Sequence, residues 1–212
     1  KLSAVEAYDI ATGKRLWRAG RPVGGSWSSP IVAKPGERKI VVAAGNPLLI
    51  AHDFDTGKEV WRVDCMWDDQ APSPVAGGGM VFAAASAGPL YAIRPGGQGN
   101  VTESHVAWGG DDGISEISSP ATDGRYVYCG LTCYEVKTGK KLWKIETDEP
   151  CEATPIIAGD RVYALDVTGV MTIFQAGPER KDPLASCSLG EGLSCRATPA
   201  FADGRIYIRA KV

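Results

Sequence analysis

The chain has 212 residues, of which 44% are hydrophobic and 23% are charged, a composition that supports a packed core and excludes a disordered protein. The formal net charge is -2, and lysine and arginine are scattered along the sequence, so the basic patch of a nucleic-acid-binding protein is absent. No run of about 18 apolar residues occurs, so the sequence predicts no membrane span.

The first element predicted in chain order is a β-hairpin that recurs along the sequence. Residues 7–17 read AYDIATGKRLW, residues 51–61 read AHDFDTGKEVW and residues 133–143 read CYEVKTGKKLW, while a degenerate copy with a longer turn ends at Trp108. The Asp or Thr side chain can bond back to turn amides, and the Gly can take the positive φ that ends a tight turn. The Trp residues, at positions 17, 61, 108 and 143, are then on the returning strands, 44, 47 and 35 residues apart.

A second landmark follows the same period. A proline after small or hydroxyl-bearing residues begins an extended stretch in each repeat, at Pro30, Pro74, Pro120, Pro155 and Pro199. Short runs rich in Val, Ile, Tyr and Thr alternate with Gly-containing turns, and no useful helical periodicity appears. A repeat of about 40–45 residues with about four short antiparallel strands is typical of a β-propeller blade.

The recurring Ala-x-Asp-x-x-Thr-Gly-x-x-x-Trp pattern resembles the tryptophan-docking motif of pyrroloquinoline quinone (PQQ)-like, or quinoprotein-like, β-propeller repeats, and the likeness extends from Ala7 to about Tyr207. In that family the Trp packs between adjacent blades, and the Thr and Gly of the hairpin support it. The resemblance therefore implies docking roles for three sets of residues. They are Trp17 with Thr12 and Gly13, Trp61 with Thr56 and Gly57, and Trp143 with Thr138 and Gly139.

The expected fold is all-β, a single β-propeller domain over residues 1–212 with four-stranded antiparallel blades. Propellers of this family generally have eight blades, whereas 212 residues at about 44 per blade give four to five, so we expect part of a larger, eight-bladed type of ring. Missing blades or self-association would complete it, and a closed ring of four or five blades is the alternative. The approximate repeats are 1–17 (the end of a blade), 18–61, 62–108, 109–143, 144–190 and an incomplete 191–212.

Cysteine and histidine give no clear metal signal. The six cysteines, at positions 65, 129, 133, 151, 187 and 195, fit no zinc or thioredoxin spacing, and His52 and His105 are the only histidines. Buried free thiols on strands are the favoured interpretation, and a disulfide between Cys187 and Cys195 is the alternative.

No catalytic, cofactor-binding or metal-binding residue is predicted. The quinone-dependent enzymes of the family bind PQQ over calcium in the central funnel, and many have a disulfide between adjacent cysteines, but this chain has no Cys-Cys pair and no recognisable funnel ligands. The best carboxylate candidates for a cation are two acidic groups, which are more typical of solvated loops at a blade rim. These groups are Asp111, Asp112 and Glu116, and Asp68 and Asp69.

Two tryptophans lie outside the repeated hairpins. Trp27 and Trp67 are in segments that precede the inner strands, so we expect them near the top of the ring or its central channel. There they either pack between blades or, with Asp68 and Asp69, bind a partner.

Two functions fit these observations. The favoured hypothesis is a non-catalytic propeller that binds protein partners as a scaffold in the bacterial envelope, with no cofactor. The alternative is a fragment of a PQQ-dependent alcohol or sugar dehydrogenase, in which PQQ with calcium would carry the hydride chemistry. The resemblance implies a periplasmic or other extracytoplasmic location, and any signal peptide would precede Lys1.

Overall fold

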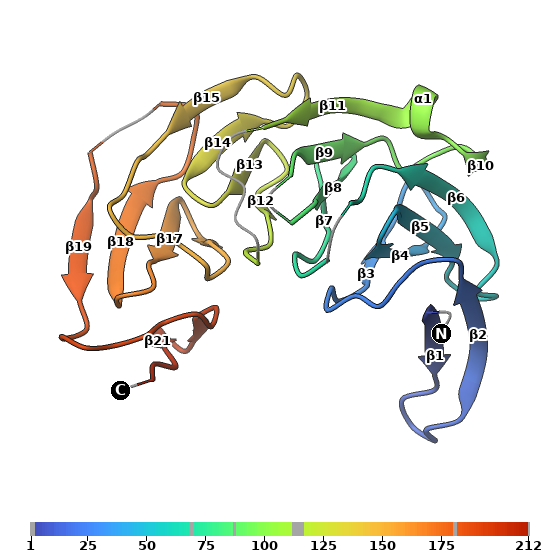
Figure 1. The fold of residues 1–212 in the computed structure, drawn as a ribbon, viewed down its shortest axis with the longest axis horizontal. Coiled ribbons are helices and arrows are strands. Elements are labelled where there is room, and N and C mark those ends of the chain that lie inside the picture. Colours follow the sequence, from blue (N-terminus) through green and yellow to red (C-terminus); the bar gives the residue numbers. More distant parts are fainter. Residues whose placement is uncertain (1–2, 68–69, 87, 112–116, 180–181, 212) are drawn as a thin grey trace.

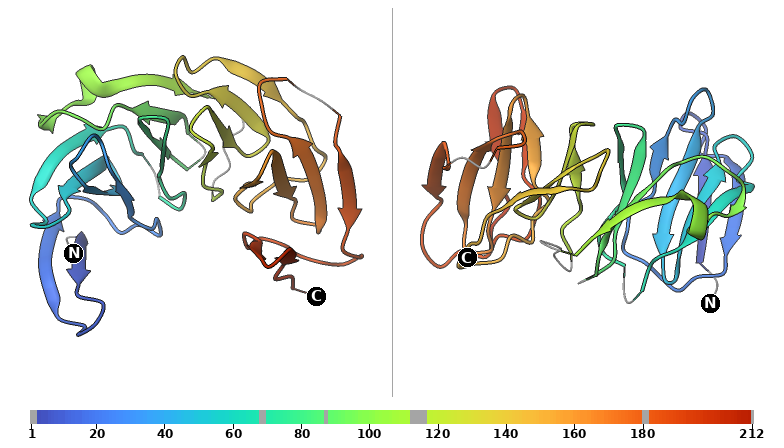
Figure 2. Two further views of the ribbon diagram at one scale, coloured as in Figure 1. Left: turned by 180° about the vertical axis from the view of Figure 1, so that it is seen from behind. Right: turned by 90° about the horizontal axis from the view of Figure 1, so that it is seen from above.

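The structure is a computed structural model that describes residues 3–67, 70–86, 88–111, 117–179 and 182–211. Its six β-sheets follow one another along an open arc, with the N-terminus at one end and the C-terminus at the other (Figure 1). We number these sheets blades 1–6 in chain order. The all-β propeller predicted from the repeats is confirmed, whereas the closed ring of four or five blades is wrong, because the two terminal sheets lie far apart (Figure 2).

Four blades are complete, and each contains four antiparallel strands in order from the inside of the arc to its outside, to which blade 2 adds a fifth, parallel strand. Blade 2 consists of β3 (Ile31–Ala33), β4 (Ile40–Gly45), β5 (Leu48–Asp53) and β6 (Glu59–Asp64). Blade 3 consists of β7 (Val75–Gly77), β8 (Met80–Ala84), β9 (Leu90–Ile93) and β11 (Val106–Gly110). Blade 4 consists of β12 (Ala121–Thr122), β13 (Tyr126–Cys129), β14 (Thr132–Glu135) and β15 (Lys141–Lys144). Blade 5 consists of β16 (Ile156–Ala158), β17 (Arg161–Leu165), β18 (Val170–Gln175) and β19 (Ala185–Ser188).

The two terminal blades are pairs of strands. Blade 1 is the outer pair, β1 (Ser3–Tyr8) and β2 (Arg15–Arg21), and blade 6 is the inner pair, β20 (Ala200–Ala202) and β21 (Arg205–Tyr207). Four complete blades and two pairs agree with the four to five blades expected from the chain length.

Blade 2 differs from the expected four strands, because the long turn of blade 3 adds a fifth. In that turn β10 (Gly99–Asn100) pairs in parallel with β6, and the short helix α1 (Thr102–His105) follows. The Val101 amide donates to the Arg62 carbonyl at 2.9 Å, and the Asp64 amide donates to the Thr102 hydroxyl at 2.9 Å. No helix in the described part of the chain is long and apolar enough for a bilayer crossing.

The hydrophobic core is divided into seams between blades. In β4 and β5 almost every side chain is buried, because both faces of these strands contact a neighbouring sheet. The largest seam joins β4, β5 and β6 to Val81, Ala83 and Ile93 of blade 3. Similar seams join blades 3 and 4, 4 and 5, and 5 and 6. Each blade is therefore stabilised mainly by its neighbours, as in other repeat architectures.

The two ends of the strands form different faces of the arc. On one, which we call the loop face, the connections between blades lie beside the turns that join the second and third strands of a blade. Thus Gly24 donates to Asn46 at 3.2 Å, Met66 to Pro47 at 3.0 Å and Ile145 to Leu131 at 3.0 Å, each from amide to carbonyl. The turns between the third and fourth strands, which carry the repeated motif, lie on the opposite face, which we call the hairpin face.

A ladder of hydroxyl groups links the blades along the loop face. The residue before each of the first four landmark prolines donates its amide to the Ser or Thr hydroxyl at the equivalent position of the following blade. The four hydrogen bonds are Ser29 to Ser73 (2.9 Å), Ser73 to Ser119 (2.9 Å), Ser119 to Thr154 (3.1 Å) and Thr154 to Thr198 (3.1 Å). The Ser/Thr-Pro pattern thus has an interblade role, because the proline begins the strand and the hydroxyl joins it to the preceding blade.

Candidate functional site: interblade docks and the loop face

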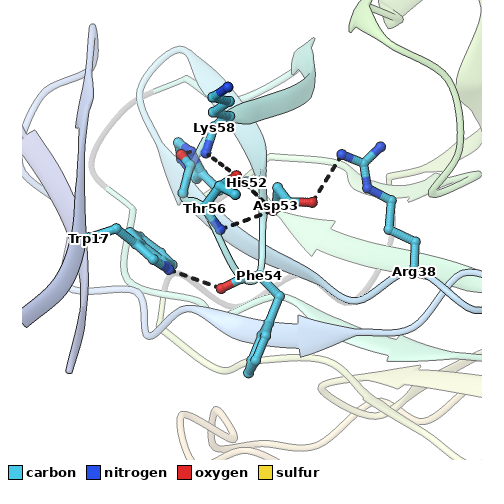
Figure 3. Close-up of polar contacts among 8 residues, drawn as sticks. Trp17, Arg38, His52, Asp53, Phe54, Thr56 and Lys58 are labelled. Atoms are coloured by element: carbon cyan, nitrogen blue, oxygen red, sulfur yellow. Dashed lines mark hydrogen bonds and ion pairs between the residues drawn. The ribbon is translucent and has the colours of Figure 1, made fainter. Parts of the chain in front are cut away.

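The turn of the repeated hairpin is closed by its own Asp and Thr. In blade 2, Asp53 Oδ1 accepts from the Thr56 amide at 3.0 Å and from its hydroxyl at 2.7 Å, and the Gly57 amide donates to the Asp53 carbonyl at 2.9 Å (Figure 3). The Thr56 hydroxyl and amide, with the guanidinium of Arg38, hold the pKa of Asp53 below its usual range. The predicted role of Asp and Thr in the turn is confirmed.

This turn receives the indole of the preceding blade. Trp17 Nε1 donates to the carbonyl of Phe54 at 2.9 Å (Figure 3). Its ring covers Gly57, where a Cβ would lie 2.6 Å from the indole and where φ is +71°. The bare Cα and the free carbonyl of one turn therefore form a binding site for one indole, which we call an indole dock.

Each tryptophan of the repeated hairpins uses a carbonyl in the same way. The other indole N–H groups donate from Trp61 to Pro95 at 3.1 Å, from Trp108 to Val136 at 2.9 Å and from Trp143 to Gly177 at 3.0 Å. Gly139 repeats the contact of Gly57, because a Cβ there would lie 2.5 Å from the ring of Trp108. Four successive interblade seams are thus linked by an indole.

The glycines that support Trp17 and Trp108 come from the following repeat, which corrects the pairing implied by the family resemblance. Gly57 supports Trp17, whereas Gly13 of the same motif as Trp17 has no atom within 4 Å of a built Cβ. Thr12, Thr56 and Thr138 close their own turns. The reason is geometric. The side chain of Trp17 projects from its own sheet toward the next blade, whereas Gly13 lies in the turn of the same sheet as Trp17.

The carbonyl acceptors Phe54, Pro95, Val136 and Gly177 were not found from the sequence. Because the main chain supplies the acceptor, the residue type is free to vary. The signal available was positional, since Phe54 and Val136 directly follow the Asp or Glu that begins the turn.

His52 lies beside the dock of blade 2 and is 2% exposed, with Nδ1 3.1 Å from the Gly57 carbonyl. Burial lowers the pKa of His52 below the usual 6.5, and the Gly57 carbonyl opposes this only in part. The folded state therefore favours the neutral imidazole. The contribution of His52 to stability is full above about pH 6.5 and decreases as the pH falls below that value.

We expect the free energy of unfolding to decrease between pH 7 and pH 5.5, by at most about 1.4 kcal/mol per pH unit, the slope for one proton. In His52→Gln this part of the pH dependence should disappear. Urea denaturation at each pH measures the free energy of unfolding of the protein and of the variant. An equal dependence of this free energy on pH in the variant would contradict the role of His52.

On the loop face, Trp27 is exposed while the backbone around it is held firmly. Its side chain is 74% exposed. The carbonyl of Gln70 accepts from the Trp27 amide at 2.9 Å, the Ser28 amide at 3.2 Å and the Ser26 hydroxyl at 3.2 Å. Of the two roles expected for Trp27, packing between blades is therefore excluded.

Trp67 has the other expected role, which is packing between blades. It is 49% exposed and meets the ring of Tyr91 edge-on, with centroids 6.0 Å apart. A Cβ at Gly88 would lie 2.7 Å from its Nε1. Trp67 thus packs from the connection after blade 2 onto the turn of blade 3.

A cavity of about 640 Å³ opens on the same face between blades 4 and 5. Leu131, Ile145 and Cys151 give it an apolar part, and the ion pair of Arg196 with Glu152 borders it. The loop face therefore combines an exposed aromatic side chain with a concave, partly charged surface.

The carboxylate candidates do not gather into a site among the described residues. Asp111 is exposed at the end of blade 3, while Asp68, Asp69, Asp112 and Glu116 lie outside the described part of the chain. Within the described ranges, no group of three His, Cys, Asp or Glu residues is placed to hold a metal ion.

All six cysteines are free thiols, so the alternative of a Cys187–Cys195 disulfide is wrong. Cys187 is exposed on β19, whereas Cys195 is buried in the connection before blade 6. Burial raises the pKa of Cys65, Cys129 and Cys133 to about 12 and that of Cys151 to about 11.

We expect a maleimide at pH 7.5 to label one thiol quickly in the folded protein and six after denaturation, because the thiolate is the reactive form. Mass spectrometry counts the adducts. Cys187→Ser should remove the fast adduct, and rapid labelling of two or more sites would contradict the burial of the others.

The successive blades, the interblade indoles and the hydroxyl ladder define an arc of a PQQ-like β-propeller. The family described as outer membrane protein assembly factor BamB matches residues 1–132 and 104–178, and the chain belongs to this family.

The solved structures that resemble the chain include a natural protein and a designed one. The crystal structure of BamB from Moraxella catarrhalis gives a TM-score of 0.70 at 17% identity, and that of the computationally designed protein Ika8 gives 0.67 at 14% identity. Each match covers 97% of this chain and 63% of the other, so this chain spans less than two thirds of their length. Similarity at these identities shows the fold. No curated protein matches the sequence significantly.

Proposed function

We propose that this protein is a non-catalytic scaffold that binds other proteins through its loop face during outer membrane protein assembly, in the periplasm or at the outer membrane of a bacterium. The family description and the likeness to BamB support the process and the location.

Trp27 is the observation that carries the proposal. A tryptophan that is 74% exposed leaves a large apolar surface in water, yet three hydrogen bonds to Gln70 fix the backbone of its segment. Rigid, exposed aromatic side chains are typical anchors of protein interfaces, because they bury much area at a small cost in conformational entropy. The cavity between blades 4 and 5 offers a second contact on the same face.

Site-specific photo-crosslinking in bacterial envelopes tests this proposal. A photoreactive amino acid in place of Trp27 should give a discrete adduct with a protein of the outer membrane assembly machinery, identified by mass spectrometry. The control is Glu37 on the other face, whose side chain is 99% exposed in the turn between β3 and β4. Equal adducts at both positions, or none at Trp27, would contradict the loop face as the binding surface.

A titration with PQQ and calcium tests the non-catalytic part separately. We expect no stoichiometric quinone absorbance and no rise in the thermal midpoint, because a ligand that binds only the folded state stabilises it. Binding accompanied by dye-linked alcohol oxidation would establish the dehydrogenase hypothesis instead.

A further inference from the structure

A second cavity, of about 600 Å³, opens on the hairpin face between blades 2 and 3, away from both ends of the arc (Figure 1). The turn between β3 and β4 forms one side, and the turns of blade 3 between β7 and β8 and between β9 and β11 form the other. Its volume lies in the range of about 300–1,000 Å³ that is usual for small-molecule sites. Pro95 in its wall is also the acceptor for the indole of Trp61, so the cavity adjoins a fixed interblade contact.

The long turn of blade 2 keeps this cavity open. Residues 34–39 join β3 to β4, whereas only Gly78 and Gly79 join β7 to β8. In the seam between blades 3 and 4 the corresponding turns pack directly, since a Cβ at Gly78 would lie 2.1 Å from the carbonyl oxygen of Gly124. In the cavity, by contrast, a Cβ at Gly36 or Gly79 would meet no atom within 4 Å. A ligand can therefore approach the main chain from both blades.

The charged side chains that line the cavity are all basic. Lys34 comes from blade 2, Arg94 and His105 come from blade 3, and no described Asp or Glu lines it. The Arg94 amide donates to the His105 carbonyl at 2.9 Å, which places these two residues side by side. Arg94 is exposed and forms no ion pair with a described residue. The cavity thus offers donors to an anion without a carboxylate of its own.

His105 is oriented by its neighbour Ser104. Its Nδ1 lies 2.8 Å from the Ser104 hydroxyl oxygen. When this hydroxyl donates to Nδ1, the neutral ring has its proton on Nε2 and can donate to an anion. Nε2 faces two glycines of the same turn, since a Cβ would lie 3.9 Å from it at Gly96 and 2.8 Å from it at Gly97. The absence of side chains at these two positions leaves Nε2 accessible.

Lys34 has only a solvent-exposed partner. Its Nζ lies 3.4 Å from Glu37, whose side chain is 99% exposed and does not line the cavity. An ion pair in solvent contributes little, so an anion in the cavity can compete with Glu37 for the ammonium group.

We propose that this cavity is a binding site for the phosphate group of a phosphate monoester. Such a group carries nearly two negative charges and three terminal oxygens, so it can accept from all three basic side chains, whereas a carboxylate has one charge and two oxygens. Val32, Pro35 and Met80 add apolar lining, which favours a phosphorylated lipid over a soluble phosphate. The site is on the face opposite to Trp27, so this inference stands apart from the protein partner of the loop face.

Calorimetric titration of the whole chain tests the proposal. The probes are dihexanoyl phosphatidic acid, which is a phosphate monoester with short acyl chains, dihexanoyl phosphatidylcholine, which has no net charge, and inorganic phosphate. We expect phosphatidic acid to bind at one site per chain, at least about tenfold more tightly than phosphatidylcholine. Weaker binding of inorganic phosphate would assign the site to a lipid, and equal binding would assign it to a soluble phosphate.

Three variants locate the site. Arg94→Gln should weaken the binding of phosphatidic acid about tenfold or more, because it removes a charged donor. Arg125→Gln is the matched control, since Arg125 is exposed in the turn between β12 and β13 on the same face but does not line the cavity. Its effect should stay within about twofold, because solvent and salt screen a charge outside the site.

Glu37→Gln should strengthen binding about two- to fourfold, because Lys34 loses its competing partner. A misfolded variant would not bind more tightly, so this gain separates binding from folding. The proposal would be overturned by an absence of binding for both phosphate probes, by equal affinity for phosphatidylcholine, or by equal losses in Arg94→Gln and Arg125→Gln.

Discussion

Trp61→Ala lowers the free energy of unfolding by about 3–5 kcal/mol, the usual cost of removing a large buried aromatic side chain. Trp61 is fully buried in the seam between blades 2 and 3, and its indole N–H donates to Pro95 at 3.1 Å. The long turn of blade 3 closes over it through β10, so little collapse can fill the cavity. Chemical denaturation followed by circular dichroism measures the loss.

Trp27→Ala is the matched control, because it removes the same side chain from a position that is 74% exposed. Its effect on stability should stay within about 0.5 kcal/mol. A loss below about 1 kcal/mol in Trp61→Ala, or equal losses in the two variants, would contradict the docking role of Trp61.

Gly57→Ala costs about 2–4 kcal/mol of stability. One part of this cost is the left-handed backbone, where an L-residue loses about 1 kcal/mol or more. The other part is overlap, because the new Cβ would lie 2.6 Å from the ring of Trp17 and would displace it from the Phe54 carbonyl. Denaturation curves give the total loss of stability. The fluorescence emission should shift to longer wavelength, because the indole of Trp17 becomes more exposed to solvent.

Gly13→Ala separates these two parts. Gly13 has nearly the same φ as Gly57, but no atom lies near the added methyl group. Only the backbone cost of about 1 kcal/mol therefore remains. The difference between the two variants measures the overlap with Trp17. If Gly13→Ala destabilised as much as Gly57→Ala, the role of Gly57 as a support for the indole would be wrong.

The blade hairpins could be predicted because their signals are local. An Asp, a Thr and a Gly within five positions close a turn by short-range hydrogen bonds and a positive φ, and the structure contains these bonds at Asp9 and Asp53. The docks could be predicted only in part. The sequence marks the tryptophan but not the carbonyl that accepts its N–H, since every residue has a carbonyl.

The two tryptophans of the loop face could also be predicted only in part. Trp27 and Trp67 occupy comparable connections in the sequence, and both were expected near the top of the ring. One remains open to solvent, while the other packs against Tyr91, because the turn of blade 3 brings Gly88 beneath it. The difference depends on a neighbouring blade and has no signal in either segment.

The sequence by itself determined the strand content, the repeat period, the closed hairpin turns and the family likeness, because these depend on residues within one repeat. Only the tertiary structure decided which glycine supports which tryptophan, where the fifth strand of blade 2 comes from, and that the cysteines are free thiols. Those features depend on contacts between residues tens of positions apart, such as the 37 that separate Trp17 from Phe54. In a propeller the faces of each sheet are buried against the neighbouring sheets. The packing of the blades therefore decides the contacts that the sequence of a single repeat does not specify.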